Sequence, residues 1–170
     1  MQPFKITYER TNQVPIIISV PHCGTGFPDD IKEEYRQDLI AHPDDTDWFV
    51  DQLYDFAPDM GMRMISATLS RWVVDLNRDP ESKPLYTDGR LITGLCPVSS
   101  FKGEPLYKDE REAVLPDEVV RRLEAFYNPY HYALQTMLKE ALAKFGKVLR
   151  GIAIASGEGC HLSTQTLFLT

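Results

Sequence analysis

The segment Ile16–Val20 is the feature of this chain that most restricts its fold. Its residues are apolar apart from one serine, and the run ends at Pro21 and His22, followed by a turn containing Gly24 and Gly26. An unbroken apolar run of this length predicts a strand buried on both faces, as in the parallel sheets of α/β proteins. Because ligands of such sheets collect at the carboxyl ends of strands, we expect His22 in a site. The alternative is a solvated turn histidine.

Composition predicts one domain that binds a small molecule. The chain has 170 residues, 43% of them hydrophobic, and a net charge of −7. Nucleic acids and anionic membranes attract clustered Lys and Arg, which this sequence lacks, so we expect neither as a partner. No apolar stretch approaches a membrane span and no signal peptide precedes the fold, so we expect a cytoplasmic protein. Cys23, Cys96 and Cys160 have no paired spacing and are predicted to be free thiols.

Hydrophobic periodicity predicts the remaining elements. No regular element is expected between residues 78 and 114, a length typical of functional loops. Pro129 should interrupt the longest helix. The predicted strands are 4–8, 62–68, 72–76 and one beginning at Lys147, and the predicted helices are 29–40, 45–57 with Asp45 or Thr46 as N-cap, and 116–145.

An acidic cluster follows the first predicted helix. Asp44, Asp45 and Asp47 stand at the start of the next one. Imidazole and carboxylate groups are the ligands of hydrolytic zinc, so His22 and this cluster together predict part of a metal site. The alternative is that the aspartates cap the helix, where its dipole favours negative charge.

Two arginines are candidates for binding a carboxylate substrate. Arg78 and Asn77 follow the predicted strand 72–76, and Arg71 precedes it. The guanidinium group binds carboxylates through two hydrogen bonds. For Arg78, the alternative is a surface salt bridge with Asp75 or Asp79.

Six motifs in order along the chain resemble the N-formylglutamate amidohydrolase family. The resemblance covers about residues 3–149, and no single motif carries it. The motifs are 19–25 (SVPHCGT), 45–54 (DTDWFVDQLY), 70–78 (SRWVVDLNR), 93–97 (TGLCP), 103–107 (GEPLY) and 129–131 (PYH).

The resemblance implies a metal-dependent hydrolase, usually with zinc, that cleaves N-formyl-L-glutamate to formate and L-glutamate during histidine degradation. It implies an α/β fold with a mixed, mainly parallel sheet flanked by helices, similar to the zinc carboxypeptidase and aspartoacylase type. His22 matches the histidine ligand of the metal, and the acidic ligand falls on Asp45 or, with better agreement, Asp47. Arg71, Asn77 and Arg78 match the substrate pocket.

Two further residues are weaker candidates for the same site. Glu104 is a candidate general base, although a glutamate in a Gly-Glu-Pro turn is more often structural. His131 is a candidate for the substrate pocket, and packing among the neighbouring tyrosines is the alternative.

The sequence departs from the family after Leu149. There the family continues with an Asp-x-His-Ser motif whose histidine resembles a third metal ligand, whereas this chain reads Arg-Gly-Ile-Ala-Ile-Ala over 150–155. We hypothesise that residues from about 150 onward come from a shifted reading frame or a truncated gene, so that 1–170 is one incomplete amidohydrolase domain. The alternatives are an inactive remnant that binds a metal or a dicarboxylate, and a deacylase of another N-acyl amino acid.

Overall fold

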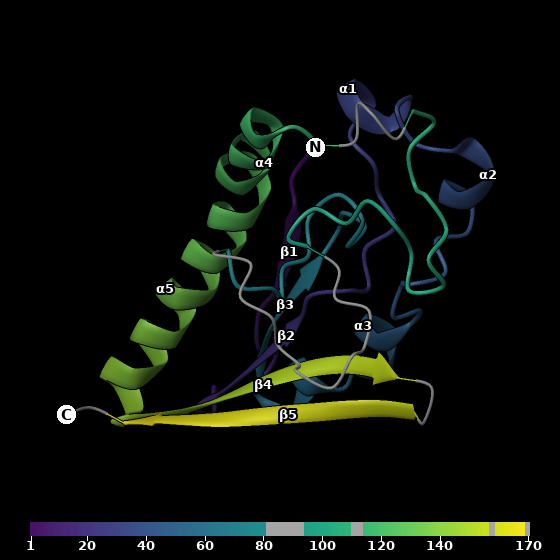
Figure 1. The fold of residues 1–170 in the computed structure, drawn as a ribbon. Coiled ribbons are helices and arrows are strands. Elements are labelled where there is room, and N and C mark those ends of the chain that lie inside the picture. The colour runs from purple at the N-terminus through teal and green to yellow at the C-terminus, as the bar shows by residue number, and fades with distance from the viewer. Residues whose placement is uncertain (81–93, 110–113, 157–158, 169–170) are drawn as a thin grey trace, which may run out of the picture.

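The computed structural model describes residues 1–80, 94–109, 114–156 and 159–168. Within these ranges, five strands form one sheet in the order β1-β3-β2-β4-β5 (Figure 1). The strands are β1 (Phe4–Thr7), β2 (Ile16–Val20), β3 (Arg63–Ala67), β4 (Lys147–Ser156) and β5 (Gly159–Phe168). The three middle strands are parallel, and each edge strand is antiparallel to its neighbour. The predicted mixed α/β fold is confirmed, but the parallel pairings do not outnumber the antiparallel ones.

Strand β2 lies at the centre of the sheet, between β3 and β4. Ile17 is 0% exposed and packs in the cluster on one face, whereas Ile18 is 2% exposed and packs in the cluster on the other. The apolar run therefore forms the strand buried on both faces that the sequence predicts. The strand ends two residues before His22.

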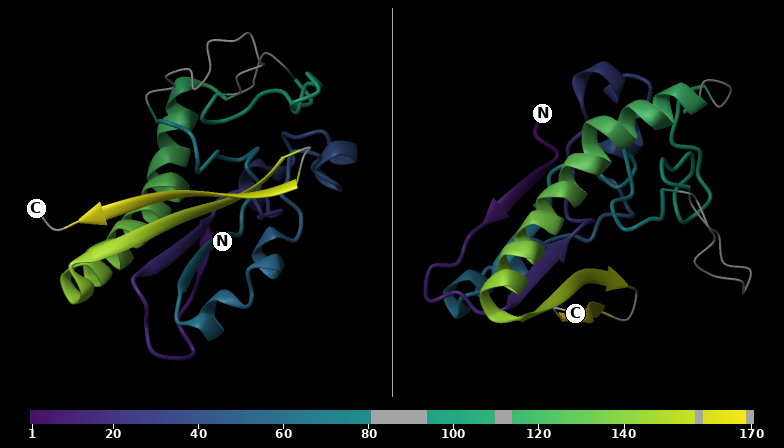
Figure 2. Two further views of the ribbon diagram at one scale, coloured as in Figure 1. Left: turned by 90° about the horizontal axis from the view of Figure 1, so that it is seen from below. Right: turned by 90° about the vertical axis from the view of Figure 1, so that its left-hand side faces the viewer.

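A long helical rod crosses one face of the sheet (Figure 2). It consists of α4 (Pro116–Arg122), a π-helical turn η3 (Leu123–Tyr127) and α5 (Asn128–Phe145), and α5 packs against β2 and β4. Gly146 ends the rod with a φ of 73°, as expected of a helix C-terminus. The predicted interruption takes the form of the π turn, which comes just before Pro129, where the missing N–H and the proline ring disturb the α-helical bonding.

The opposite face carries the short helices α3 (Val50–Leu53) and η1 (Ala57–Met60). Val50 and Ala57 pack there with Ile18, and Ala153 of β4 completes the cluster. None of the helices in the described ranges combines the length and the apolarity needed to cross a membrane.

The single helix predicted over 29–40 is wrong. The segment forms α1 (Asp29–Lys32) and α2 (Gln37–Ile40), and between them Arg36 is extended, with a ψ of 117°. Tyr35 is fully buried and forms an isolated bridge with Tyr107. This tertiary pairing overrides the helical periodicity.

The helix predicted over 45–57 is also wrong, together with its cap. Only Val50–Leu53 is α-helical, and it starts after Phe49, whose φ of 63° is not helical. No side chain caps this helix, and Leu53 and Phe56, expected on its buried face, are exposed. The aspartates before it accept hydrogen bonds from distant parts of the chain instead, as described below.

The strand predicted over 72–76 is wrong as well. These residues are buried but lie in turns and irregular backbone. Of the predicted loop, residues 81–93 and 110–113 lie outside the described residues, and with them Thr93 of the fourth motif. Residues 94–109 form turns and isolated bridges.

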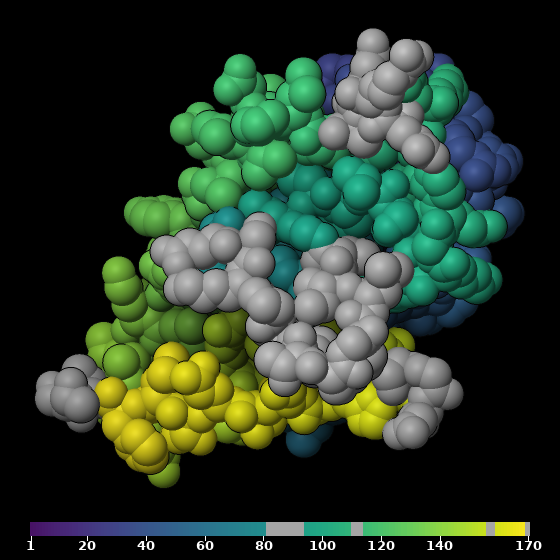
Figure 3. Space-filling model, viewed as in Figure 1, coloured from purple at the N-terminus to yellow at the C-terminus, as the bar shows by residue number. Residues whose placement is uncertain are grey.

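Strand β5 forms the far edge of the sheet. Nine of its ten residues are exposed, and Leu167 is intermediate. Figure 3 shows the β4–β5 hairpin in yellow at the surface. The cysteines Cys23, Cys96 and Cys160 are free, as predicted.

Candidate active site

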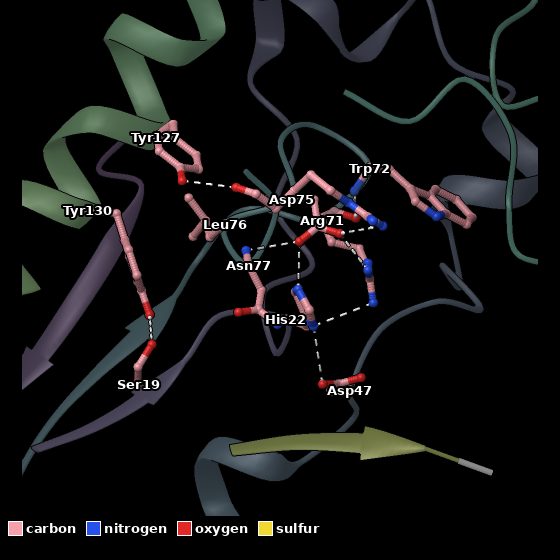
Figure 4. A network of polar contacts seen from close by, with 12 residues as sticks. Ser19, His22, Asp47, Arg71, Trp72, Asp75, Leu76, Asn77, Tyr127 and Tyr130 are labelled. Carbon is pink, nitrogen blue, oxygen red and sulfur yellow. Dashed lines mark hydrogen bonds and ion pairs between the residues drawn. The ribbon is translucent and has the colours of Figure 1, made fainter. Parts of the chain in front are cut away.

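The site lies at the carboxyl end of β2, where the chain leaves the sheet and the His22 side chain is buried in the protein interior. The His22 side chain is 5% exposed, and its Nε2 lies 2.8 Å from Oδ1 of Asp75 (Figure 4). The turn that follows requires glycine, because a Cβ at Gly24 would lie 2.3 Å from the carbonyl oxygen of Leu69. His22 is therefore part of a buried polar network and not a solvated turn residue.

Asp75 joins the polar groups of this network. Its Oδ2 accepts a hydrogen bond from Arg71 Nη2 at 2.6 Å and lies 3.9 Å from Arg78 Nη2, and its Oδ1 accepts the backbone N–H of Asn77 at 3.0 Å. Burial by itself favours the neutral acid, but hydrogen bonding to His22 and the charges of His22 and Arg71 outweigh it and hold the pKa of Asp75 well below its usual value. Asp75 is therefore ionised at pH 7.

The ionisation of Asp75 determines how the His22 ring is oriented and protonated. A carboxylate only accepts hydrogen bonds, so Nε2 of His22 carries a proton and donates it to Asp75. The other nitrogen, Nδ1, lies 3.4 Å from Arg71 Nη1 and 3.5 Å from Asp47 Oδ2. In the neutral ring, Nδ1 thus carries the lone pair that a metal ion or a proton would take.

Asp47 connects the turn after β2 to the end of β4. Its backbone N–H donates to the carbonyl oxygen of His22 at 3.0 Å, and its Oδ2 accepts the backbone N–H of Ala155 at 3.0 Å. These two bonds place the buried carboxylate beside the imidazole ring.

Asp45 has a different role. Its Oδ2 accepts the indole N–H of Trp72 at 2.7 Å, and both of its oxygens accept the backbone N–H of Phe101. Of the two predicted acidic ligands, the structure therefore places Asp47 beside His22, whereas Asp45 anchors the segment containing Phe101. Asp44 pairs with Lys102 on the surface.

Both candidate arginines are buried at the site. Arg71 and Arg78 are each 8% exposed, and the Arg71 guanidinium lies 4.6 Å from the ring centre of Phe101. Asp75 is thus a partner of both arginines. For Arg78, the alternative named a salt bridge with Asp75 or Asp79 on the surface, but its pair with Asp75 is buried. Asn77 is half-buried and contacts Asp75 through its backbone.

The two weaker candidates lie in different surroundings. Glu104 is exposed in a turn, where its backbone N–H donates to Ser100 Oγ. His131 Nε2 lies 2.9 Å from the carbonyl oxygen of Leu76, and its ring lies 4.1 Å from that of Tyr127. The structure thus supports packing for His131, next to the segment that carries the site.

Cys23 follows His22 but is not an activated nucleophile. Its Sγ contacts the carbonyl oxygens of Val20 and Ala67, and burial raises the pKa of the thiol to about 12. Since the thiolate is the reactive form, a cysteine-dependent hydrolase mechanism is disfavoured.

The network fits a metal site in part. His22 Nε2 is held by a carboxylate, which is how metal-binding histidines are commonly oriented, and Nδ1 faces the Asp47 carboxylate. A catalytic zinc needs three protein ligands. Among the described residues, no group of three or more His, Cys, Asp and Glu is arranged to hold an ion. Of the described residues, His22 and Asp47 are the two whose side chains could act as ligands at this place.

Comparisons with known proteins show what this chain is similar to. The family model described as N-formylglutamate amidohydrolase matches residues 14–151, which include the whole network except Ala155. An N-formylglutamate deformylase of Pseudomonas putida is 39% identical over 145 residues, covering 85% of this chain and 53% of that protein. A second N-formylglutamate deformylase, from Pseudomonas aeruginosa, is 39% identical over 142 residues, covering 82% of this chain and 51% of that protein.

Solved structures share the fold. The crystal structure of an N-formylglutamate amidohydrolase from Ralstonia eutropha superposes with a TM-score of 0.75 at 26% identity, covering 92% of this chain and 59% of that one. A gene product of Agrobacterium tumefaciens has a TM-score of 0.71 at 18% identity, covering 92% of this chain and 57% of that one. The chain spans about half the length of the curated relatives it matches.

Proposed function

Because this chain belongs to the N-formylglutamate amidohydrolase family, we propose that its site acts on N-formyl-L-glutamate and hydrolyses the formyl amide to formate and L-glutamate. The observation that carries the proposal is the buried network of His22, Asp75 and Arg71 at the carboxyl end of β2. This end of the sheet is where α/β proteins bind ligands.

The arginines supply substrate binding in this proposal. Arg71 and Arg78 bind the carboxylates of the glutamate moiety, and the amide side chain of Asn77, whose backbone N–H donates to Asp75, adds a further polar contact. Asp75 holds Arg71 and His22 in place, which fixes the substrate relative to the imidazole ring. In the reaction, the oxygen of water bonds to the formyl carbon, the C–N bond breaks, and the leaving nitrogen takes a proton.

The proposal includes a divalent metal, with zinc as the first choice. His22 Nδ1 and Asp47 would hold it, and when bound it lowers the pKa of its water and polarises the formyl oxygen. The proposal has three further parts. The enzyme takes part in histidine degradation, it acts in the cytoplasm, and its fold is similar to the zinc carboxypeptidase type.

A substrate comparison tests the function. With zinc present, the chain is expected to release formate from N-formyl-L-glutamate at least about tenfold faster than it releases the acyl group from N-acetyl or N-succinyl glutamate, because a pocket shaped for the smallest acyl group excludes larger ones. A preference for a larger acyl group would identify a different deacylase. Binding of N-formyl-L-glutamate without formate release would favour the alternative of an inactive remnant. That alternative is compatible with a site in which no group of three or more ligands is found among the described residues.

We further propose that a one-nucleotide shift in reading frame replaces the Asp-x-His-Ser motif that the family resemblance leads us to expect. The family match ends at residue 151. Residues 150–155 are encoded by the pattern CGN GGN ATH GCN ATH GCN when arginine uses a CGN codon. Beginning two nucleotides later, the same bases read NGG NAT HGC NAT HGC, which includes Trp-Asp-Cys-His-Ser among its translations.

Sequencing the gene tests this second proposal. The shifted motif requires the codons GGG for Gly151, GCC for Ala153 and ATA for Ile154, and we expect to find all three. The shifted frame should then stay open beyond the histidine codon. A different codon at any of these three positions would exclude the shift, because the Asp, His or Ser of the motif would be lost.

A further inference from the structure

The segment 71–78 carries most of the site and lies outside the five-stranded sheet of the described residues. Its residues are buried apart from the half-buried Asn77, and its backbone forms turns and irregular structure. Side chains from elsewhere in the chain bind its carbonyl oxygens instead. Among the described residues there are four such hydrogen bonds: Tyr35 donates to the carbonyl oxygen of Trp72 (3.1 Å), Arg122 to that of Val73 (3.3 Å), His131 to that of Leu76 (2.9 Å) and Tyr127 to that of Arg78 (2.9 Å).

Three of these four donors come from the helical rod. Arg122 ends α4, Tyr127 ends the π turn, and His131 lies in the first turn of α5. Arg122 and Tyr127 are five residues apart, and Tyr127 and His131 are four apart. Five residues return to the same face across a π turn, whereas four do so in an α-helix. The π turn therefore brings all three side chains into one row facing segment 71–78.

The donors Tyr127 and His131 are neutral. Burial raises the pKa of Tyr127 and lowers the pKa of His131. Their rings lie 4.1 Å apart and support each other (Figure 4 shows Tyr127 above Leu76 and Asp75). His131 can only donate to a carbonyl oxygen, so the proton on its Nε2 is fixed by Leu76.

We infer that Tyr127 and His131, aligned by the π turn η3, are positioning residues that set the place of Asp75 and Arg78 and through them the orientation of the His22 ring. The inference rests on the proposed function for its effect on substrate. Its structural part does not, because the row of donors and the Asp75–His22 contact are present in the chain itself.

The test uses Tyr127→Phe, which removes one hydroxyl, with Tyr132→Phe as the matched control. Tyr132 is on the same helical rod and is 74% exposed. Two quantities are measured: the dissociation constant for N-formyl-L-glutamate by calorimetry, and the ring resonances of His22 by NMR. We expect Tyr127→Phe to weaken binding about three- to tenfold, the usual effect of one lost hydrogen bond, and to shift the His22 signals. The control should change neither quantity.

A second variant tests the role of the π turn. Deleting Glu124, which is exposed within η3, should restore α-helical spacing and leave Arg122 four residues from Tyr127, still in line with Tyr127 and His131. We expect the His22 signals to shift less than in Tyr127→Phe, while Glu124→Ala leaves them unchanged. A larger shift in the deletion than in Tyr127→Phe would overturn the argument that the alignment of the donors sets the position of the network.

Tyr127→Phe keeps the inference testable if the deletion does not fold. Unshifted His22 signals in folded Tyr127→Phe would overturn the inference, even if the variant were less stable, because the hydroxyl would then serve packing alone. If the parent chain does not bind N-formyl-L-glutamate, the proposed function fails, and the His22 signals still decide whether Tyr127 positions the network.

Discussion

Replacing Asp75 by asparagine is expected to destabilise the protein by about 3–5 kcal/mol, the usual cost of removing one partner from a buried ion pair. Asparagine keeps the shape of the side chain and can still accept from His22 and Asn77. The substitution removes the negative charge of Asp75, whose Oδ2 lies 2.6 Å from Arg71 Nη2 and 3.9 Å from Arg78 Nη2. Urea denaturation at pH 7 measures the change in the free energy of unfolding.

The control for this experiment is Asp38→Asn, which breaks an exposed pair with Arg36 and should leave the denaturation midpoint unchanged. The pH dependence gives a second check. Since the pKa of Asp75 is lowered in the folded state, its stabilising contribution is fully present above its unfolded pKa of about 3.9 and declines as the pH falls below that value. The difference between parent and Asp75→Asn should therefore shrink between pH 4 and pH 3. A constant difference would show that the charge of Asp75 is not what stabilises the fold.

Replacing His22 by alanine is expected to weaken zinc binding at least about a hundredfold and to abolish formate release. Mutation of a residue that only orients a metal ligand typically lowers metal affinity about 10- to 100-fold. Removal of the metal ligand itself should therefore lower the affinity for zinc by more. Nδ1 of His22 faces Asp47, and the remaining carboxylate cannot hold the ion alone. Zinc affinity and stoichiometry are measured by calorimetry and elemental analysis.

Two further variants make this result interpretable. His42→Ala changes an exposed histidine and should leave zinc binding unchanged. His22→Gln offers an amide that can still donate to Asp75 but has no imidazole lone pair, so it should fold like the parent and fail to bind zinc. Unchanged zinc stoichiometry in both His22 variants would exclude His22 as a ligand.

The parts of the fold that sequence predicts well are those with a strong local signal. Strand β2 is an unbroken apolar run, and the rod over 116–145 has long periodicity with Pro116 at its start and Gly146 after its end. The failures over 29–40, 45–57 and 72–76 share a physical cause. Buried side chains there bind distant backbone and side-chain groups, as Tyr35 binds Trp72, and such contacts leave no periodic pattern.

The site was predictable to a similar extent. His22, Asp47, Arg71 and Arg78 do meet. The strand β2 before His22 signalled its position, whereas the other three were found from their residue types and motifs, since the strand predicted over 72–76 does not form. Asp75 was predicted only as a salt-bridge partner, although it is the group that joins the others. Its four-residue spacing from Arg71 was the available signal. The use of both Asp45 oxygens by Trp72 and Phe101 depends on tertiary contacts that the sequence does not show.

The parallel pairing of β2 with β4 also governs when the site can form. Ile16 of β2 pairs with Leu149, and the carboxylate of Asp47 is fixed by Ala155, both more than a hundred residues downstream. Pairings between such distant segments form slowly, because a long loop must close first. During synthesis, β2 can join β3 early, but its other edge stays open until residues 147–156 leave the ribosome. We therefore expect the imidazole ring and its acidic neighbour to reach their final arrangement only after β4 has paired with β2.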